Sequence, residues 1–289
     1  MKKFFTTLAL ELLTLAASAQ ENPNRVIVKQ KYKAPVGYLA ERIDSIYFTK
    51  LEGSVAADVK FLSFSKGNLT DTIRLAVTKT PECKSYKIAC MPAGQANSFA
   101  SDAALEQYFD QLEDCPTFTD DFTNAALTGL DMEFQSNGTY SLVTLGYDKY
   151  GIACASSRAD FTTPNSDLVG DPKVLYTVVE VKPDNFTIWF QPNGDCYGYY
   201  LCAFKAGTAE ELFEKWSKEE GFVNLQDMIK SWGSDKYTDT QMYKWSGMEP
   251  GTDYVVYSLP VDVNEADAPF QIIPVTSTES GGEGEATVT

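Results

Sequence analysis

The 289-residue chain contains no histidine. Without an imidazole it lacks the Ser-His-Asp and Cys-His nucleophile systems and the common metal sites that use histidine ligands. The sequence also has no Cys-x-x-Cys pair for zinc or redox chemistry and no Asp-x-Asp-x-Asp-Gly loop for calcium. The Arg-Gly-Asp tripeptide of integrin adhesion is absent as well. These absences argue against catalysis, and we expect no metal and no cofactor.

Basic residues are scarce relative to acidic ones. Lys and Arg together number 24, against 40 Asp and Glu, which gives a formal net charge of −16 at pH 7. A surface of this sign repels phosphate backbones, so we expect no nucleic-acid partner. The charge is typical of a well-solvated protein surface.

The one long apolar run lies at the N-terminus. Two lysines precede the mostly apolar stretch Phe4–Ala17, and Ala17-Ser18-Ala19 matches the cleavage pattern of a secretory signal peptide. The run is interrupted by Glu11 and is too short to span a bilayer comfortably. Gln20 rather than Cys follows the cleavage point, so bacterial lipid attachment lacks its acceptor. We expect a bacterial protein without a membrane span that is secreted, periplasmic or on the outer cell surface.

The chain contains a repeat with a spacing of 113 residues. The segment CYGYYLCAFKAG, Cys196–Gly207, matches CKSYKIACMPAG, Cys83–Gly94, in its Cys, Tyr, apolar and Ala-Gly positions. The alternating segments DTIRLAV, Asp71–Val77, and DNFTIWF, Asp184–Phe190, align at the same spacing without gaps. Such alternation predicts strands with one face in a core. A repeat of this length indicates two like domains rather than a solenoid of short units.

A third pair of segments, NGTYSLVTL and PGTDYVVYSL, aligns with a one-residue gap. The second copy reads Met248-Glu249-Pro250-Gly251-Thr252-Asp253-Tyr254, and the first keeps Gly138-Thr139-Tyr140. An alternating strand, a Tyr-led strand and a Pro-Gly-Thr-x-Tyr element in this order resemble the fibronectin type III family of immunoglobulin-like sandwiches. The resemblance covers roughly residues 58–277. It implies that Tyr140 and Tyr254 are corner tyrosines, whose hydroxyls bind nearby backbone.

We therefore predict an all-β fold of two tandem fibronectin type III-like β-sandwich domains, each with a helical insertion. Phe190 and Val77 stand where the family has its second-strand tryptophan. Trp189 has the opposite parity and is expected to face outward or to lie under another element. Both copies also carry a long insertion between the Tyr-led strand and the corner tyrosine.

The insertions have helical patterns. In the first copy Ser101 is a candidate cap for a helix with apolar residues at helical spacings, namely Leu105, Tyr108, Phe109 and Leu112. In the second copy Thr208-Ala209-Glu210-Glu211 matches a capping box before an apolar face of Leu212, Phe213 and Trp216. A second helix there fits the spacing of Phe222, Leu225, Ile229 and Trp232.

The predicted organisation has five parts: a signal peptide at 1–19, an N-terminal extension at 20–57, fibronectin-like domains at 58–164 and 165–277, and a disordered acidic tail at 278–289. The extension has no partner in the repeat. Its stretch Ile43–Phe48 is predicted to form a short strand, which is a candidate edge strand of the first sandwich.

Tryptophan supplies the candidate ligand-binding residues. Trp216, Trp232 and Trp245 fall in the second insertion, while the first insertion has no Trp. Exposed indole rings suit stacking against sugar rings, but the helical spacing of Trp216 and Trp232 favours a role in packing helices onto the sheet. Trp189 and Trp245 lie outside those periodic faces, and we expect them to be the more exposed pair.

We expect a non-catalytic exported binding module that recognises a glycan or a protein on a surface, by analogy with the use of such modules. One alternative is a carboxylate-dependent hydrolase with its site in the helical insertions. Another is a purely structural spacer. Acidic residues are plentiful, but Glu210 and Glu211 in the first turn of a helix are better explained by the helix dipole than by catalysis.

The six cysteines are too few to define a disulfide framework. Cys83 and Cys196 hold equivalent places before the Tyr-led strand of each copy, so duplication accounts for both without a shared bond. Cys90 falls on the inward parity of its strand, where an unpaired thiol packs as a small apolar group. We predict that most of the six thiols are unpaired, with Cys90–Cys154 as the candidate exception.

Overall fold

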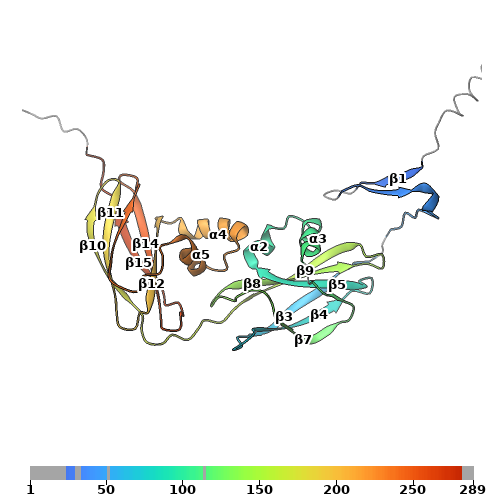
Figure 1. Cartoon of the computed structure of the whole chain (residues 1–289), viewed down its shortest axis with the longest axis horizontal. Helices are drawn as coiled ribbons and strands as arrows, with labels where there is room; N and C mark the ends of the chain where they lie inside the picture. The colour runs from blue at the N-terminus through green and yellow to red at the C-terminus, as the bar shows by residue number, and fades with distance from the viewer. Residues whose placement is uncertain (1–23, 30–33, 51–52, 113–114, 282–289) are drawn as a thin grey trace, which may run out of the picture. The chain divides into compact units, whose positions relative to one another are not determined.

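The computed structural model describes residues 24–29, 34–50, 53–112 and 115–281 (Figure 1). The predicted signal peptide, its cleavage point after Ala19, and residues 282–289 of the acidic tail lie outside the described residues. The chain divides into two compact units, and the division falls between Glu52 and Gly53. None of the described helices has the length and apolar character that a membrane span needs.

The N-terminal unit contains a small two-stranded sheet. Strand β1 (Arg25–Val28) pairs antiparallel with β2 (Val36–Leu39), and a short 3-10 helix η1 (Ala40–Arg42) follows. The strand predicted at Ile43–Phe48 is wrong, since this stretch is irregular and Phe48 is 97% exposed. An alternating pattern forms a strand only when a neighbouring strand supplies hydrogen bonds and a face to cover.

The first sandwich consists of two antiparallel sheets. In spatial order, one sheet contains β3 (Ala57–Ser65), β4 (Thr72–Lys79) and β7 (Phe122–Thr128). The other contains β6 (Thr117–Phe118), β5 (Ser85–Pro92), β8 (Thr139–Tyr147) and β9 (Ala153–Thr162). The predicted inward face of β4 is confirmed: Ile73, Leu75 and Val77 are fully buried, in a core shared with Tyr86 and Leu142 of the facing sheet.

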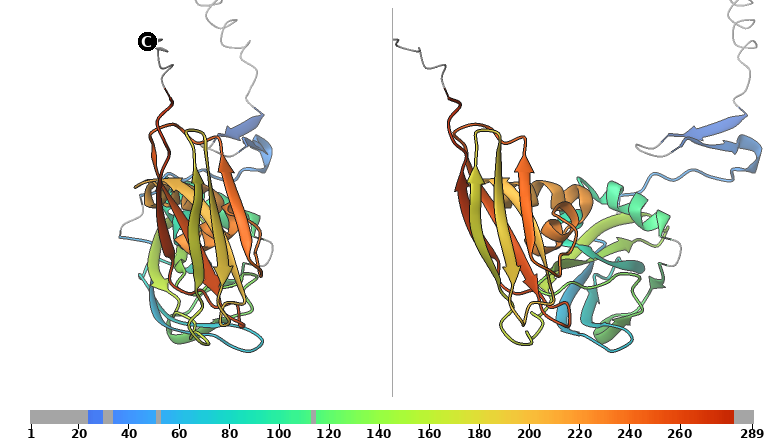
Figure 2. Two further views of the ribbon diagram at one scale, coloured as in Figure 1. Left: turned by 90° about the vertical axis from the view of Figure 1, so that its left-hand side faces the viewer. Right: turned by 60° about the vertical axis from the view of Figure 1, so that its left-hand side comes forward.

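The second sandwich is built in the same way. One sheet contains β10 (Val174–Val181), β11 (Asn185–Pro192) and β13 (Gln241–Ser246). The other contains β12 (Gly198–Lys205), β14 (Asp253–Val261) and β15 (Gln271–Thr276). The predicted inward residues of β11, Phe186, Ile188 and Phe190, are fully buried in the second core. Figure 2 shows these strands, yellow to red, side by side along one direction.

Both sandwiches have the strand order of immunoglobulin-like domains. With the strands lettered in chain order, A, B and E form one sheet and C, F and G the other, and helices stand where a D strand would lie. The first sandwich adds β6 beside strand C, at the place where the second has an isolated bridge between Tyr199 and Tyr237. The prediction of an all-β, fibronectin type III-like sandwich fold is confirmed.

The described helices are α2 (Ala93–Ser98), α3 (Asp102–Gln111), α4 (Ala209–Glu220) and α5 (Leu225–Trp232). The predicted cap of α3 is confirmed, because the Ser101 side chain accepts a hydrogen bond from the Ala104 N–H. The predicted capping box is wrong: Thr208 has helical backbone angles, and its hydroxyl donates to the Lys205 carbonyl. Asn224 caps α5, which the apolar spacing did not indicate, and α2 was not predicted.

The helices cover the outer face of the C-F-G sheet in each sandwich. In the first, Leu105 and Phe109 of α3 pack on Met91 and Val143. In the second, Met228 and Ile229 of α5 belong to one cluster with residues of β12 and β14. Strands β8 and β14 are therefore buried on both faces, and even the polar Ser141 and Thr144 of β8 are fully buried.

Tyr140 is a corner tyrosine, as the resemblance implied. Its hydroxyl accepts a hydrogen bond from the Gln135 N–H at 2.8 Å. The Thr163 hydroxyl, just after strand β9, donates to the carbonyl of the same Gln135. Both polar backbone groups of this one residue are thus held by side chains, which fixes the connection between β7 and β8.

The second sandwich repeats this corner. The Tyr254 hydroxyl accepts from the Glu249 N–H at 2.8 Å, and the Ser277 hydroxyl donates to the Glu249 carbonyl. Each of these residues stands 114 positions after its counterpart in the first corner. The turn aspartates Asp148 and Asp262 have the same spacing, and each accepts two N–H bonds from the residues that follow it. Equal spacings of this kind are what a duplication predicts.

All six cysteines are free, so the Cys90–Cys154 disulfide hypothesis is wrong. The strand register gives the reason. Cys90 lies opposite Leu142, while Cys154 follows Ala153, which lies opposite Tyr147. Leu142 and Tyr147 are five residues apart on one strand, roughly 16 Å, whereas a disulfide needs Cα atoms within about 7 Å.

The corner hydroxyls are expected to contribute measurably to stability. Replacing Tyr140 or Tyr254 with Phe leaves a backbone N–H unpaired, and each variant should lose about 1–2 kcal/mol of unfolding free energy in urea titrations. Tyr147→Phe is the matched control, because the buried Tyr147 hydroxyl has no hydrogen-bond partner among the described residues. Equal losses in all three variants would contradict a special role for the corner.

Thiol labelling near pH 8 should separate buried from accessible cysteines. Burial raises the pKa of Cys90 to about 12 and that of Cys202 to about 11, so neither forms the reactive thiolate in the folded chain. We expect both to stay unlabelled by iodoacetamide until guanidinium unfolds the protein without reductant, after which all six cysteines react. Fewer than four reactive thiols in the unfolded protein would show that a disulfide framework exists.

Candidate functional site

The structure does not bring the four candidate tryptophans together at one surface. Trp245 lies on β13, not in the helical insertion, and its ring centroid is 5.2 Å from that of Phe186 and 4.4 Å from that of Tyr243. The prediction that Trp245 is exposed is wrong, because β13 is a regular strand whose odd-numbered residues face the second core. Trp189 is half-buried on β11, opposite Met242 of β13, so the expectation that Trp189 and Trp245 are the more exposed pair is wrong for both.

The other two tryptophans fix the helices of the second sandwich to each other. Trp216 of α4 and Trp232 of α5 meet edge to face, with centroids 5.4 Å apart. Trp232 also meets Phe222 edge to face at 5.6 Å. Its 39% exposure is the largest of the four tryptophans. Packing between the helices therefore accounts for both residues. Of the four indole rings, that of Trp232 alone is open enough to stack on a sugar.

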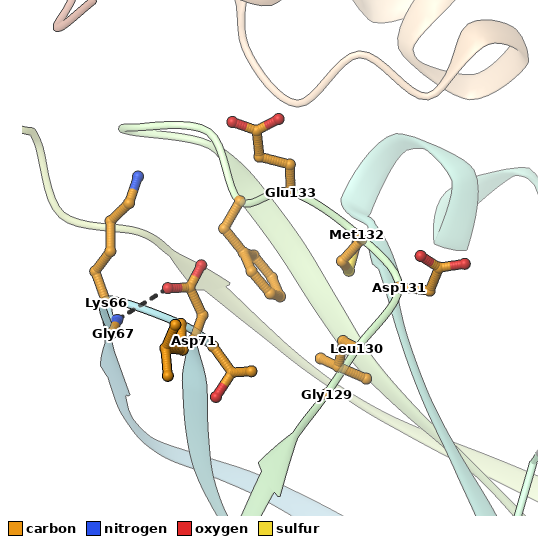
Figure 3. Close-up of a pocket in the computed structure, with 11 residues that line it drawn as sticks. Lys66, Gly67, Asp71, Gly129, Leu130, Asp131, Met132 and Glu133 are labelled. Carbon is orange, nitrogen blue, oxygen red and sulfur yellow. Dashed lines mark hydrogen bonds between the residues drawn. The ribbon is translucent and has the colours of Figure 1, made fainter. Parts of the chain in front are cut away.

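A pocket of about 560 Å³ lies at one end of the first sandwich (Figure 3). Two loops form it: the connection from β3 to β4, which includes Lys66, Leu69 and Asp71, and the first part of the connection from β7 to β8, Gly129–Phe134. Phe134, at the inner end of the pocket lining, is 4% exposed and packs edge to face on the corner residue Tyr140. Contact with Tyr140 of the corner thereby holds Phe134 of the pocket lining in place.

Glycine shapes both loops. A Cβ on Gly67 would lie 2.1 Å from the Thr70 carbonyl oxygen, so only glycine allows this tight return of the chain. The Gly67 N–H donates to Asp71 Oδ1 at 3.0 Å, drawn as a dashed line in Figure 3. Gly129 has a φ of +69°, a left-handed conformation that ends β7 and turns the chain into the pocket wall.

The pocket combines apolar and acidic groups. Leu130 and Met132 lie along one wall, and Leu69 of the other loop is 97% exposed. Asp71, Asp131 and Glu133 carry negative charge, against the single positive charge of Lys66. Figure 3 shows the Lys66 and Glu133 side chains reaching toward the same side of the pocket. A ligand with a cationic group and an apolar group would match this lining.

Sequence reasoning missed the pocket because its two walls are separated by about 60 residues and carry no motif. One signal was present in the repeat. The loop before β4 spans six residues and the loop before β8 spans ten, whereas the equivalent loops of the second sandwich span three and six. The first copy therefore has extra loop length at the end where the pocket lies.

The corner of the first sandwich also receives the turn between α4 and α5. The Thr139 N–H donates to the Val223 carbonyl at 3.0 Å, and the Asn224 side-chain amide donates to the Ser136 carbonyl at 2.8 Å. Val223 is 6% exposed and belongs to the first core. Gly138 permits this approach, since a Cβ there would lie 2.9 Å from Val223 Cγ2. The turn thus seals the core beside the pocket.

The two carboxylates whose pKa is raised have structural roles. Burial raises the pKa of Asp227 and of Asp267, and Lys230 opposes the rise in both. Lys230 Nζ lies 2.6 Å from Asp267 Oδ1, and Asp227 Oδ2 accepts from the Val223 N–H. Neither carboxylate lines the pocket. Across the described ranges, no group of three or more Asp, Glu or Cys is suited to hold a metal ion.

Comparison with known proteins gives only distant likenesses. No protein-family model and no curated protein matches the chain. Solved structures similar to it include the fibronectin domains FN1–FN3 of chicken CNTN1, with 12% identity, coverage of 78% of this chain and 68% of that one, and a TM-score of 0.26. Another is the central fibronectin-III array of RIM-binding protein, with 9% identity, coverage of 79% and 70%, and a TM-score of 0.23. Because these TM-scores are low, the fold assignment rests on the strand order and the two cores.

Proposed function

We propose that the chain is an exported, non-catalytic binding module that recognises a protein partner through the loop-lined pocket of the first sandwich. The observation that carries the proposal is the pocket's combination of the exposed Leu69 side chain and the half-buried Leu130 and Met132 with a net negative lining. Its natural ligand is a protein segment with a Lys or Arg beside an apolar residue.

A protein fits the pocket better than a glycan does. Sugar rings are recognised by open aromatic faces, and the lining contains one aromatic residue, Phe134, which is 4% exposed. Three of the four tryptophans are half-buried, and the fourth, Trp232, packs against Trp216 and Phe222. The acidic lining also repels carboxylated and sulfated sugars.

The second sandwich has a supporting role in this proposal. Its α4–α5 turn contributes Val223 to the first core and hydrogen-bonds Ser136 and Thr139, which lie two and five residues after the pocket wall ends at Phe134. These contacts hold the β7–β8 connection in place, so the pocket is organised before a ligand arrives. Preorganisation of this kind lowers the entropic cost of binding.

Export remains part of the proposal, and it rests on the N-terminal sequence. Signal-peptide cleavage after Ala19 gives a mature protein that begins at Gln20. N-terminal sequencing of the protein recovered from outside the cytoplasm of its native host should read Gln20-Glu21-Asn22-Pro23. A retained Met1 or an attached lipid would refute export by this route.

The pocket can be tested with a phage-displayed random peptide library selected on the mature protein. We expect enrichment of peptides with Lys or Arg next to an apolar residue. Glu133→Lys should weaken the binding of a selected peptide about tenfold, and Lys66→Glu should strengthen it, since one ion pair in a partly buried site is worth about 1.4 kcal/mol. Fluorescence anisotropy with the synthetic peptide measures both affinities.

Glu219→Lys is the matched control. Glu219 is exposed on α4, outside the pocket, and its substitution changes the net charge by the same amount as Glu133→Lys. Its peptide affinity should equal that of the wild type. If Glu133→Lys and Glu219→Lys weaken binding equally, the net charge of the chain and not the pocket attracts the peptide. Binding of a neutral glycan that Trp232→Ala abolishes would instead favour the glycan alternative.

A further inference from the structure

The hairpin of β1 and β2 differs in charge from the main body of the chain. Residues 24–39 contain four basic residues and no acidic one, whereas residues 53–289 contain 16 Lys and Arg against 35 Asp and Glu. Arg25 begins β1 and Lys29 follows it, and both are exposed. Neither cation forms an ion pair among the described residues. The positive charge of the hairpin is therefore available to an acidic partner.

The hairpin also leaves large apolar side chains open to solvent, namely Ile27 at 61% exposure, Val28 at 42%, Val36 at 51% and Tyr38 at 50%. Alternation along β1 places Arg25 and Ile27 on one face of the hairpin. Gly37 stands opposite Ile27 and has no side chain to cover it. Because a two-stranded hairpin is marginally stable at best in water, it gains stability from a surface that covers Ile27.

The pocket of the first sandwich has the complementary composition. Leu69, Leu130 and Met132 offer apolar contacts, and Asp131 and Glu133 are exposed on its wall. Neither of these two carboxylates forms an ion pair among the residues that the structure describes. An Arg and an Ile on one face of a strand are the combination of cationic and apolar groups that this lining matches.

We propose that the protein partner bound by the pocket is the β1–β2 hairpin of a second copy of this chain, an assignment that rests on the function proposed above. Ile27 of one copy packs on Leu69 and the apolar wall of the other, and Arg25 pairs with Glu133. The opposite charges of hairpin and body draw the two copies together. The contact covers apolar side chains that are exposed on both elements.

The chain enters the first sandwich at the end opposite the pocket. Strand β3 begins at Ala57, shortly after the division between Glu52 and Gly53, and ends at Ser65, directly before Lys66 of the pocket. Nine residues of strand span roughly 26 Å. A hairpin that bound its own chain would have to return along this length, whereas the pocket of a second copy is open to it from solution. Because the two surfaces in contact differ, copies are added head to tail.

Sedimentation velocity of the mature protein, which begins at Gln20, tests the contact over a range of concentrations. The wild type should form assemblies whose size increases with concentration. Arg25→Glu and Glu133→Lys each place like charges in the contact, and each should weaken the association at least tenfold. The two substitutions combined in one chain restore opposite charges and should return the association to near the wild-type level.

A mixture of two variants tests the direction of the contact. Ile27→Ser removes an apolar side chain from the hairpin and leaves the pocket intact, whereas Glu133→Lys alters the pocket and leaves the hairpin intact. Each variant alone should stay monomeric at concentrations where the wild type assembles. Their equal mixture should form a dimer and stop there, because one intact hairpin meets one intact pocket. Growth of the mixture beyond the dimer contradicts the head-to-tail contact.

Lys218→Glu and Glu219→Lys are the matched controls, because both residues are exposed on α4 and the substitutions make the same charge changes outside hairpin and pocket. Both variants should assemble as the wild type does, and circular dichroism should show that every variant is folded. A wild type that is monomeric at every concentration overturns the proposal. So does an assembly that neither charge reversal weakens.

The peptide selected on the pocket separates a failure of this assembly from a failure of the proposed function. If the wild type stays monomeric and Glu133→Lys still weakens binding of that peptide, the pocket binds a different protein and only the self-recognition is refuted. If Glu133→Lys changes neither assembly nor peptide binding, both proposals fail. Protection of the β1 amides from hydrogen exchange in a monomer would place the hairpin on its own chain and equally refute the contact between copies.

Discussion

The hydrogen bond between a corner tyrosine and the backbone five residues before it is the constraint on which much of this structure depends. In the first sandwich, Tyr140 and Thr163 hold the N–H and the carbonyl of Gln135, and a connection of ten residues is thereby fixed. A connection of that length would otherwise retain considerable conformational freedom. The pocket wall lies before Gln135, and the backbone groups that bind the α4–α5 turn lie after it. Because Gln135 is held in place, the positions of both segments are fixed.

The helical insertions add a second set of contacts, on the outer face of each C-F-G sheet and at the first corner. Each stands in place of a D strand and covers the outer face of the C-F-G sheet, so strands β8 and β14 are buried on both sides. The α4–α5 turn then reaches the first corner through Val223 and Asn224. An insertion whose helices pack on its own sheet and whose turn packs on the first corner thus contacts both sandwiches.

Sequence patterns predicted the features that depend on local periodicity. They failed for the features that depend on strand register or on which loops lie close together. Alternation identified the buried faces of β4 and β11, and the Pro-Gly-Thr-x-Tyr element located the corner. Trp245 was assigned to the insertion because no local signal marks where β13 begins. The Cys90–Cys154 hypothesis used parity without register, and the register separates the two residues along β8. The pocket joins loops that are distant in sequence, so neither loop indicates it alone.

The two sandwiches share their corners and cores and differ in loops and edges, and this division indicates where function lies. Core positions are constrained by packing in any sandwich, so a duplicated domain can change freely only at exposed segments. The first sandwich has the longer loops and the pocket, with a charged β3. The second has short loops at the equivalent end and an open, apolar β10. The two copies thereby differ at their surfaces, and a change at one of these surfaces leaves both cores intact.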